Sequence, residues 1–279
     1  MATTVTRESI ELLRQRLSVE GKSESTKRGY AGDTRTFFDW LGSDTLPIED
    51  FEFKAAEHLN FCKKYADRKM STTARRVSGL RGFAWYVHGI DNFLPRYATP
   101  KVAPGAPHPL IEGIDGVLQM IDTARTTEER ALVALAGLCG ARVSEARELR
   151  VCDIDLVDMI VTLGGKRDKY RPVPISRQAM PHIVGWMIEV KNMGRENMFD
   201  MCDRTARNWL TRIHKEAGLE GEGSSHDLRM TFGTAVYEKT KDIRVVQELL
   251  GHASPTTTQI YIGIRLSAMR NGVELDLTA

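Results

Sequence analysis

A cluster of prolines divides the chain into two parts of different character. Five of the ten prolines fall between residues 95 and 109, where Gly105 also lies and apolar periodicity is absent. Proline removes a backbone hydrogen-bond donor and disfavours helix, so this composition predicts an extended, semi-stiff linker. In a chain of 279 residues we therefore expect two domains, over 1–97 and 110–279, joined by a linker at 98–109.

The first part shows helical periodicity throughout. Apolar and aromatic residues recur there at three- and four-residue spacing, and no stretch alternates as a strand does. The expected helices cover residues 9–17, 25–41, 53–65 and 71–87. The first 97 residues are thus predicted to form a small four-helix domain.

Positive charge is concentrated in that helical domain. Between Phe61 and Arg81 there are seven bases and one acid, whereas residues 101–279 carry 23 bases and 24 acids. A segment with such an excess of positive charge, on a protein whose net charge is near zero, is typical of a surface that binds a polyanion. A helix face that is merely solvated would have the same composition. The candidate phosphate-binding residues are Lys63, Lys64, Arg68, Lys69, Arg75, Arg76 and Arg81.

The second part mixes helices with a few short strands. Its periodicity predicts helices at about 113–124, 127–139, 144–149, 177–192 and 203–217. Runs rich in β-branched residues predict strands at 154–156, 159–163 and 170–175. The fold class expected for the whole chain is mainly α with a small antiparallel β-sheet.

The sequence has no signature of a metal site, a membrane span or a secretory signal. The longest apolar run, 131–141, is far shorter than the about 18 residues of a membrane helix, and the N-terminus lacks a charged-then-apolar pattern. Four cysteines, at positions 62, 139, 152 and 202, have neither CxxC pairing nor histidines at metal spacing. We expect a cytosolic protein that binds neither membrane nor metal and whose cysteines are buried, reduced thiols.

Several polar residues fall at the ends of predicted elements. His226 and Arg229 are three residues apart, so a helix beginning near Ser225 would carry both on one face. Far upstream, Arg142 directly precedes a predicted helix, and Lys166 occupies the loop of a predicted hairpin. Functional side chains are often found at such positions, on loops held by a rigid scaffold.

Two more polar residues follow near the C-terminus. A helix capped by Asp242 would end at Gly251, which places His252 in the corner after it. Tyr261 lies nine residues beyond that histidine, on the helix expected next. Any one of these residues taken alone would more often be structural, as a salt-bridge partner, a helix-end histidine or a half-buried aromatic. Their combination points to a site.

The chemistry of the set suits a phosphoryl group that gains negative charge. Arginines grip phosphate in a bidentate manner, and imidazoles donate hydrogen bonds or transfer protons. A tyrosine adds a nucleophile, but ionising a phenol of pKa near 10 at pH 7 costs roughly 4 kcal/mol, so a base or a strongly positive site is required. The predicted catalytic residues are Arg142, Lys166, His226, Arg229, His252 and Tyr261.

These residues resemble the motifs of the tyrosine recombinases, also called the phage integrase family. Gly-Ala-Arg-Val-Ser-Glu at 140–145 is similar to the family's first-arginine motif, and His-Asp-Leu-Arg at 226–229 to its His-x-x-Arg motif. Leu-Gly-His at 250–252 followed by Tyr261 resembles the last motif, and 165–174 resembles the hairpin that carries the lysine. The likeness spans the second domain, and the helical first domain with its linker matches the family's core-site clamp.

The resemblance implies a helical core-type DNA-binding domain and an α+β catalytic domain. Tyr261 would attack a DNA phosphodiester to give a 3′-phosphotyrosine and a free 5′-hydroxyl. Lys166 would protonate the leaving oxygen, and His226 would act as acid or base toward the tyrosine. Glu145 would brace the site without touching phosphate. The non-bridging oxygens would be held by Arg142, Arg229 and His252, with no metal or other cofactor.

The resemblance also implies partners and a biological role. The partners are double-stranded DNA and a homo-tetramer on two DNA sites, with an accessory directionality factor as a further candidate. The tail at 264–279 could dock on a neighbouring subunit or pack on its own domain. Strands would be exchanged through a Holliday junction.

The expected role is that of a phage or mobile-element integrase, active in viral genome integration in the host cytoplasm or nucleoid. An Xer-like dimer-resolution recombinase has the same chemistry, and a type IB topoisomerase-like enzyme would relax supercoils as a monomer. A non-catalytic DNA-binding repressor would have no reason to keep all six groups.

Overall fold

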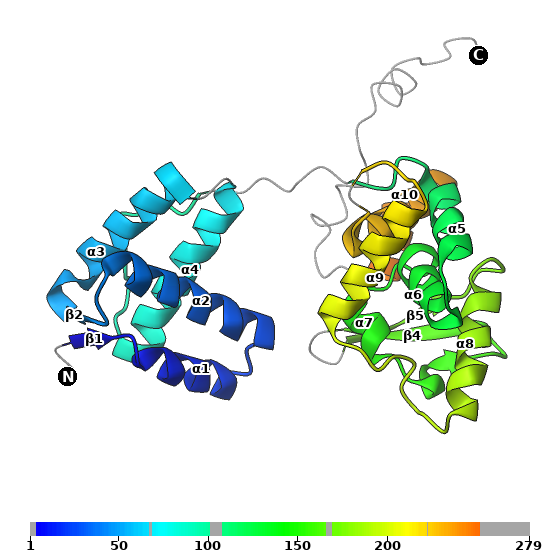
Figure 1. Ribbon diagram of the computed structural model, residues 1–279, viewed down its shortest axis with the longest axis horizontal. Coiled ribbons are helices and arrows are strands. Elements are labelled where there is room, and N and C mark those ends of the chain that lie inside the picture. The colour runs from blue at the N-terminus through cyan, green and yellow to red at the C-terminus, as the bar shows by residue number, and fades with distance from the viewer. Residues whose placement is uncertain (1–3, 67–68, 101–107, 166–168, 222, 252–279) are drawn as a thin grey trace, which may run out of the picture. The chain divides into compact units, whose positions relative to one another are not determined.

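The computed structural model describes residues 4–66, 69–100, 108–165, 169–221 and 223–251 (Figure 1). The chain divides into two compact units, Met1–Ala103 and Pro104–Ala279. The predicted Arg68, Lys166, His252 and Tyr261, and most of the predicted linker, lie outside the described residues. Each unit is described below by itself.

The first unit contains four α-helices within its described residues. They pack around one aromatic-rich core, in which Phe37 lies 5.7 Å from Phe51 and Phe51 lies 5.9 Å from Phe83, centroid to centroid. A π-helical turn, Cys62–Ala66, prolongs the third helix. The helices are α1 (Ser9–Val19), α2 (Glu24–Leu41), α3 (Ile48–Phe61) and α4 (Met70–His88).

The first unit also contains a small β-ribbon. Strands β1 (Thr4–Thr6) and β2 (Thr45–Pro47) pair antiparallel, with Val5 opposite Leu46 and both side chains buried. The prediction that residues 1–97 form helices throughout is therefore wrong at these two segments. A strand of three residues places only one side chain in the core, which is too little for an alternating pattern to be visible in the sequence.

The second unit combines helices with a three-stranded antiparallel sheet in the order β3-β4-β5. The mainly α fold with small antiparallel sheets is thus confirmed. The strands are β3 (Ile154–Asp155), β4 (Ile160–Gly165) and β5 (Lys169–Pro174). The helices are α5 (Gly113–Thr123), α6 (Thr127–Leu138), α7 (Val143–Glu148), α8 (Met180–Asn192), α9 (Asp203–Glu216), α10 (Ser225–Thr240) and α11 (Ile243–Leu250).

Helix α6 is the central element of the second unit. Every residue from Ala131 to Leu138 is buried, because α5, α8 and α10 all pack against it. A helix that is apolar on all sides is stable only in such surroundings. Thr126 caps its first turn by accepting a 3.1 Å hydrogen bond from the amide of Glu129. The end of this fixed helix leads directly into the first-arginine motif.

Strand β5 carries an arginine on its buried face. Val161 pairs with Val173 and Leu163 pairs with Arg171, and all four side chains are buried. Because side chains alternate between the two faces of a strand, Arg171 lies on the same face as Val173. The guanidinium is thereby directed into the unit.

The four cysteines are free, but only two of them are buried. Burial raises the pKa of the Cys139 thiol to about 12, and Cys62 is also buried. Cys152 and Cys202 are exposed, so the prediction of four buried thiols is wrong for these two. Both lie outside regular helix interiors, in a short 3-10 turn and just before α9, where periodicity gives no information on which side chains face inward.

None of the helices in the described residues combines the length and the apolar character that crossing a bilayer demands.

Candidate active site

A sharp turn at Gly140 connects α6 to the first-arginine motif. The turn closes with a 2.9 Å hydrogen bond from the Ala141 amide to the Leu135 carbonyl. Gly140 has φ +64°, and a Cβ atom there would lie 2.5 Å from the ring of Phe232 and 3.0 Å from Leu250. Both the backbone conformation and the close packing require glycine. The turn is thus pressed against α10 and α11.

Arg142 follows this turn as the N-cap of α7. Its amide donates a 2.8 Å hydrogen bond to Oε2 of Glu145, and its guanidinium donates to Oε1 of the same carboxylate. The Arg142 side chain nevertheless remains 42% exposed, whereas that of Glu145 is 3% exposed. Arg142 is therefore held from behind and keeps a surface on which a ligand can bind.

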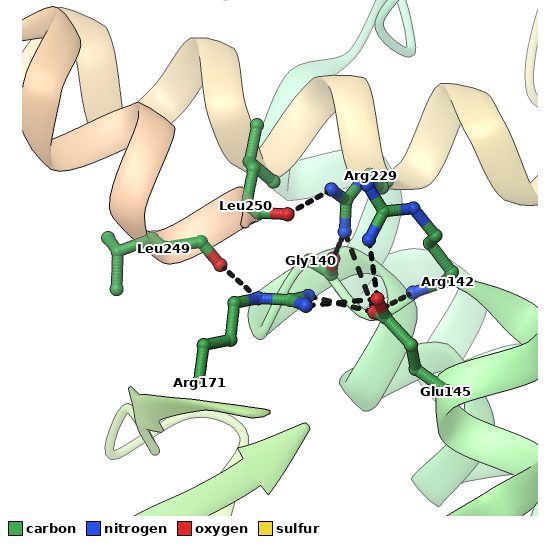
Figure 2. A network of polar contacts seen from close by, with 7 residues as sticks. All are labelled: Gly140, Arg142, Glu145, Arg171, Arg229, Leu249 and Leu250. Carbon is green, nitrogen blue, oxygen red and sulfur yellow. Dashed lines mark hydrogen bonds and ion pairs between the residues drawn. The ribbon is translucent and has the colours of Figure 1, made fainter. Parts of the chain in front are cut away.

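Arg229 is the buried arginine of the site. It lies on α10, is 3% exposed, and donates hydrogen bonds to the carbonyl oxygens of Gly140 and Leu250. Its Nη1 also lies 3.7 Å from Oε2 of Glu145. Arg229 thereby joins the turn before α7 to the end of α11, which are far apart in the sequence (Figure 2).

Arg171 is a third arginine of the site, which the sequence reasoning missed. Its Nη1 and Nη2 donate hydrogen bonds of 2.9 and 2.8 Å to the two carboxylate oxygens of Glu145. Its Nε donates a 2.8 Å bond to the carbonyl oxygen of Leu249. The signal was present in the predicted strand at 170–175, because alternation places Arg171 on the same face as Val173 and Ile175. A charged residue on an otherwise apolar face requires a buried partner.

Glu145 is the common partner of the three arginines. Burial favours its neutral form and is the largest single effect, but the hydrogen bonds from Arg171 and from the Arg142 amide outweigh it. The pKa of Glu145 is therefore lowered and the carboxylate is ionised. Three guanidiniums around one carboxylate leave a net charge of +2 in the cluster. Such a cluster suits an anion with more than one charged oxygen.

His226 lies in the first turn of α10. Ser224 caps that helix, and its amide donates a 2.7 Å bond back to Oδ2 of Asp227. The pKa of His226 is lowered mainly by desolvation, with smaller lowering effects of Arg229, Arg142 and His108, against an opposing effect of Asp227. The imidazole is thus neutral at pH 7 and can accept a proton.

The described part of the site contains half of the six predicted catalytic residues. Arg142, Arg229 and the supporting Glu145 are in contact, and His226 is near enough for two of their charges to affect its pKa. Lys166, His252 and Tyr261 lie outside the described residues. Among the described residues, no three His, Cys, Asp or Glu side chains are grouped so that they could hold a metal ion.

The predicted phosphate-binding residues of the first unit differ in their surroundings. Lys63, Lys64 and Lys69 are exposed, and Arg76 is partly buried. Arg81 donates hydrogen bonds of 3.2, 2.9 and 3.0 Å to the carbonyl oxygens of the segment that follows α4, at Phe93, Leu94 and Tyr97. Arg81 therefore has a structural role, because these bonds hold the segment after α4 against that helix.

Arg75 has a structural partner as well. Its Nη1 donates a 2.6 Å hydrogen bond to Oδ2 of Asp33, which is 2% exposed, and it also bonds the Gly29 carbonyl at 3.5 Å. Arg75 itself is half-exposed. It thus combines an ion pair between α2 and α4 with a solvent-facing surface.

Comparison with known proteins places this chain in a family. The phage integrase family matches residues 114–266. The tyrosine recombinase XerA of Thermococcus kodakarensis is 31% identical over 277 residues, which cover 96% of this chain and 94% of the relative. The tyrosine recombinase XerD of Lacticaseibacillus casei is 33% identical over 268 residues, covering 88% and 90%.

Solved structures show the same fold. The XerH recombinase bound to its difH substrate has a TM-score of 0.72 at 22% identity, covering 96% of this chain and 83% of that one. A lambda integrase dimer bound to a core site has a TM-score of 0.70 at 20% identity, covering 94% and 96%. The family match covers more than half of the chain, and the relatives align over nearly its full length. The cluster around Glu145 lies within the matched residues. The chain belongs to the phage integrase family and is a tyrosine site-specific recombinase.

Proposed function

We propose that this recombinase cuts and rejoins double-stranded DNA through a covalent link between Tyr261 and a 3′-phosphate. The observation that carries the proposal is the +2 cluster, in which Arg142 is half-exposed while Glu145 and Arg229 are buried behind it. A phosphodiester that becomes pentacoordinate gains charge on its two non-bridging oxygens. Preorganised guanidiniums stabilise that charge without reorganising during the reaction.

The chemical step is a balanced transesterification. The phenolic oxygen of Tyr261 forms a bond to phosphorus while the bond from phosphorus to the 5′-oxygen breaks. The phenolic proton passes to His226, whose lowered pKa keeps the ring neutral and able to accept it. Lys166 gives a proton to the departing 5′-oxygen. One ester replaces another, so the reverse reaction with a different 5′-hydroxyl rejoins the strand without an added energy source.

Arg142, Arg229 and His252 are proposed to bind the non-bridging oxygens, and Glu145 to hold the arginines. This step uses no metal. In the first unit we propose that Lys63, Lys64 and Lys69 contact the DNA backbone, because they are exposed and belong to a segment of the sequence rich in positive charge. Arg75 and Arg76 are proposed to add to that surface.

We propose that the chain works as a tetramer on two DNA sites, in the cytoplasm where the DNA lies. The solved relatives include a lambda integrase tetramer on a Holliday junction, which supports such an assembly. Two biological roles share this chemistry. Dimer resolution is supported by the names XerA and XerD of relatives at 31% and 33% identity. Integration of phage or mobile DNA is the other role, and the repeats and genes that flank the coding sequence separate the two.

Covalent selection of the DNA site tests the proposed function. Nicked duplexes with randomised inverted repeats are incubated with the protein in EDTA, and species that survive denaturation are sequenced. Cleavage near the nick releases a short fragment that carries the free 5′-hydroxyl. Once this fragment diffuses away, the strand cannot be rejoined, so the covalent complex accumulates. We expect enrichment of one pair of inverted repeats. Failure to trap DNA from any duplex, including duplexes with the natural flanking repeats, would contradict the proposal.

A further inference from the structure

We propose that Arg171 is a positioning residue that keeps Arg142 available to the phosphate by occupying the carboxylate of Glu145. This inference rests on the proposed function, since it concerns the same phosphate. All three guanidinium nitrogens of Arg171 donate hydrogen bonds within the protein, to the Leu249 carbonyl and the Glu145 carboxylate, so Arg171 acts through its neighbours.

The hydrogen-bond pattern at Glu145 explains how Arg171 acts. Both carboxylate oxygens accept a bond from Arg171, at 2.9 and 2.8 Å, in a bidentate pair (Figure 2). Arg142 donates through a single guanidinium nitrogen, and Nη1 of Arg229 lies 3.7 Å from Oε2. Bidentate pairs are the strongest that arginine makes. Glu145 therefore pairs mainly with Arg171, and Arg142 keeps a half-exposed guanidinium surface for a ligand.

Loss of Arg171 would change the charge as well as the geometry. The net charge of the cluster would fall from +2 to +1, since one of three guanidiniums would be missing around one carboxylate. The freed oxygens of Glu145 would then compete with phosphate for Arg142 and Arg229. Both effects weaken the grip on an anion.

Arg171 also holds the end of α11. Its Nε bonds the carbonyl oxygen of Leu249 at 2.8 Å, two residues before Gly251. Gly251 has φ +61°, and a Cβ atom there would lie 2.9 Å from Cδ of Arg171. The same side chain thus contacts the carboxylate behind Arg142 and the turn that leads to His252. Arg171, on β5, thus connects α7, through Glu145, with the end of α11, through Leu249.

The variants are Arg171→Gln, which removes the charge, and Arg171→Lys, which keeps it but cannot form the bidentate pair. The matched control is Arg212→Gln. Arg212 lies in the same unit but far from the cluster in the sequence, and it forms ion pairs with Glu129 and Glu216. The control therefore loses an arginine of structural importance without changing the charge of the site.

The first measurement is the rise in melting temperature caused by inorganic phosphate, which requires neither Tyr261 nor a DNA site. The Arg171→Gln variant should lose about 10- to 100-fold in phosphate affinity, by analogy with the loss found when residues that orient the ligands of a metal ion are replaced. Arg171→Lys should recover part of that loss, and Arg212→Gln should bind phosphate as the unaltered protein does. An equal response of Arg171→Gln and Arg212→Gln would overturn the inference.

The second measurement is the cleavage rate at saturating DNA, on the selected duplex with a normal or a methylphosphonate linkage at the scissile position. A methylphosphonate carries no negative charge, so it needs less positive charge from the site. The defect of Arg171→Gln should shrink on the neutral linkage. An equal defect on both linkages would contradict the positioning role. If the unaltered protein traps no DNA, the proposed function fails, and the phosphate measurement alone decides the role of Arg171.

Discussion

The carboxylate of Asp33 lies 2.6 Å from the guanidinium of Arg75 and is almost completely buried, whereas the arginine is half-exposed. The pair joins α2 to α4. Replacing Arg75 with alanine would leave the buried charge without this partner, so we expect a loss of about 1 to 3 kcal/mol in unfolding free energy. Calorimetry of the full chain measures it. An unchanged transition would show that the pair adds no stability, as for many surface ion pairs.

The exposed lysines between α3 and α4 should govern the salt dependence of DNA binding. Replacing Lys63, Lys64 and Lys69 with alanine removes up to three phosphate contacts, so the slope of log affinity against log salt should fall by about 2 to 3 units. Lys22→Ala removes one exposed charge from the same unit and serves as the control. A slope unchanged by the triple variant would mean that this block of charge faces solvent in the complex.

Gly140 should be irreplaceable for two separate reasons. Alanine there must adopt φ +64° and also places a Cβ atom 2.5 Å from the ring of Phe232. We expect Gly140→Ala to cost about 2 to 4 kcal/mol, from left-handed strain together with overpacking. Gly194→Ala is the matched control, since Gly194 has φ +70° with no atom near its missing Cβ. It should cost only about 1 kcal/mol of strain. Equal losses in denaturant unfolding would contradict the packing argument.

The lowered pKa of His226 predicts a pH profile for cleavage. With the neutral ring as proton acceptor, the rate at subsaturating DNA should rise with pH and level off, with an inflection below the ordinary value of 6.5. His226→Gln should remove this inflection. The same lowered pKa also affects stability. Because the unfolded chain binds the proton more readily than the folded protein, His226 lowers the free energy of unfolding as pH falls below about 6.5. An inflection above 6.5 would show that another group is titrating.

The sequence predicts the elements of the second unit because their signals are local. Asp242 caps α11 by accepting a 2.8 Å hydrogen bond from the amide of Arg244, and Gly251 ends that helix at φ +61°. Both helix ends agree with those predicted from the sequence. The contact of Arg142 with Glu145 is also local, since they share one turn. Such features depend on residues three or four apart and can be read without knowing the fold.

The features that the sequence does not reveal depend on long-range pairing. The ribbon of β1 and β2 joins segments about 40 residues apart, and each strand is too short to show a pattern. Arg171 lies 26 residues from Glu145, so their contact depends on the tertiary fold. Arg75 and Arg81 belong to the basic block by composition, but their partners at Asp33 and after α4 become visible only in the structure.

The central claim is that Tyr261 forms the covalent link to DNA. Trapped protein–DNA complexes from the selected duplex are digested, and mass spectrometry locates the tyrosine that carries the nucleotide. The account predicts a 3′-phosphotyrosine at Tyr261, formed in EDTA and abolished in Tyr261→Phe, which should still bind the duplex nearly as tightly. A nucleotide on a different tyrosine, such as Tyr170 or Tyr237, or an adduct that persists in Tyr261→Phe, would contradict it.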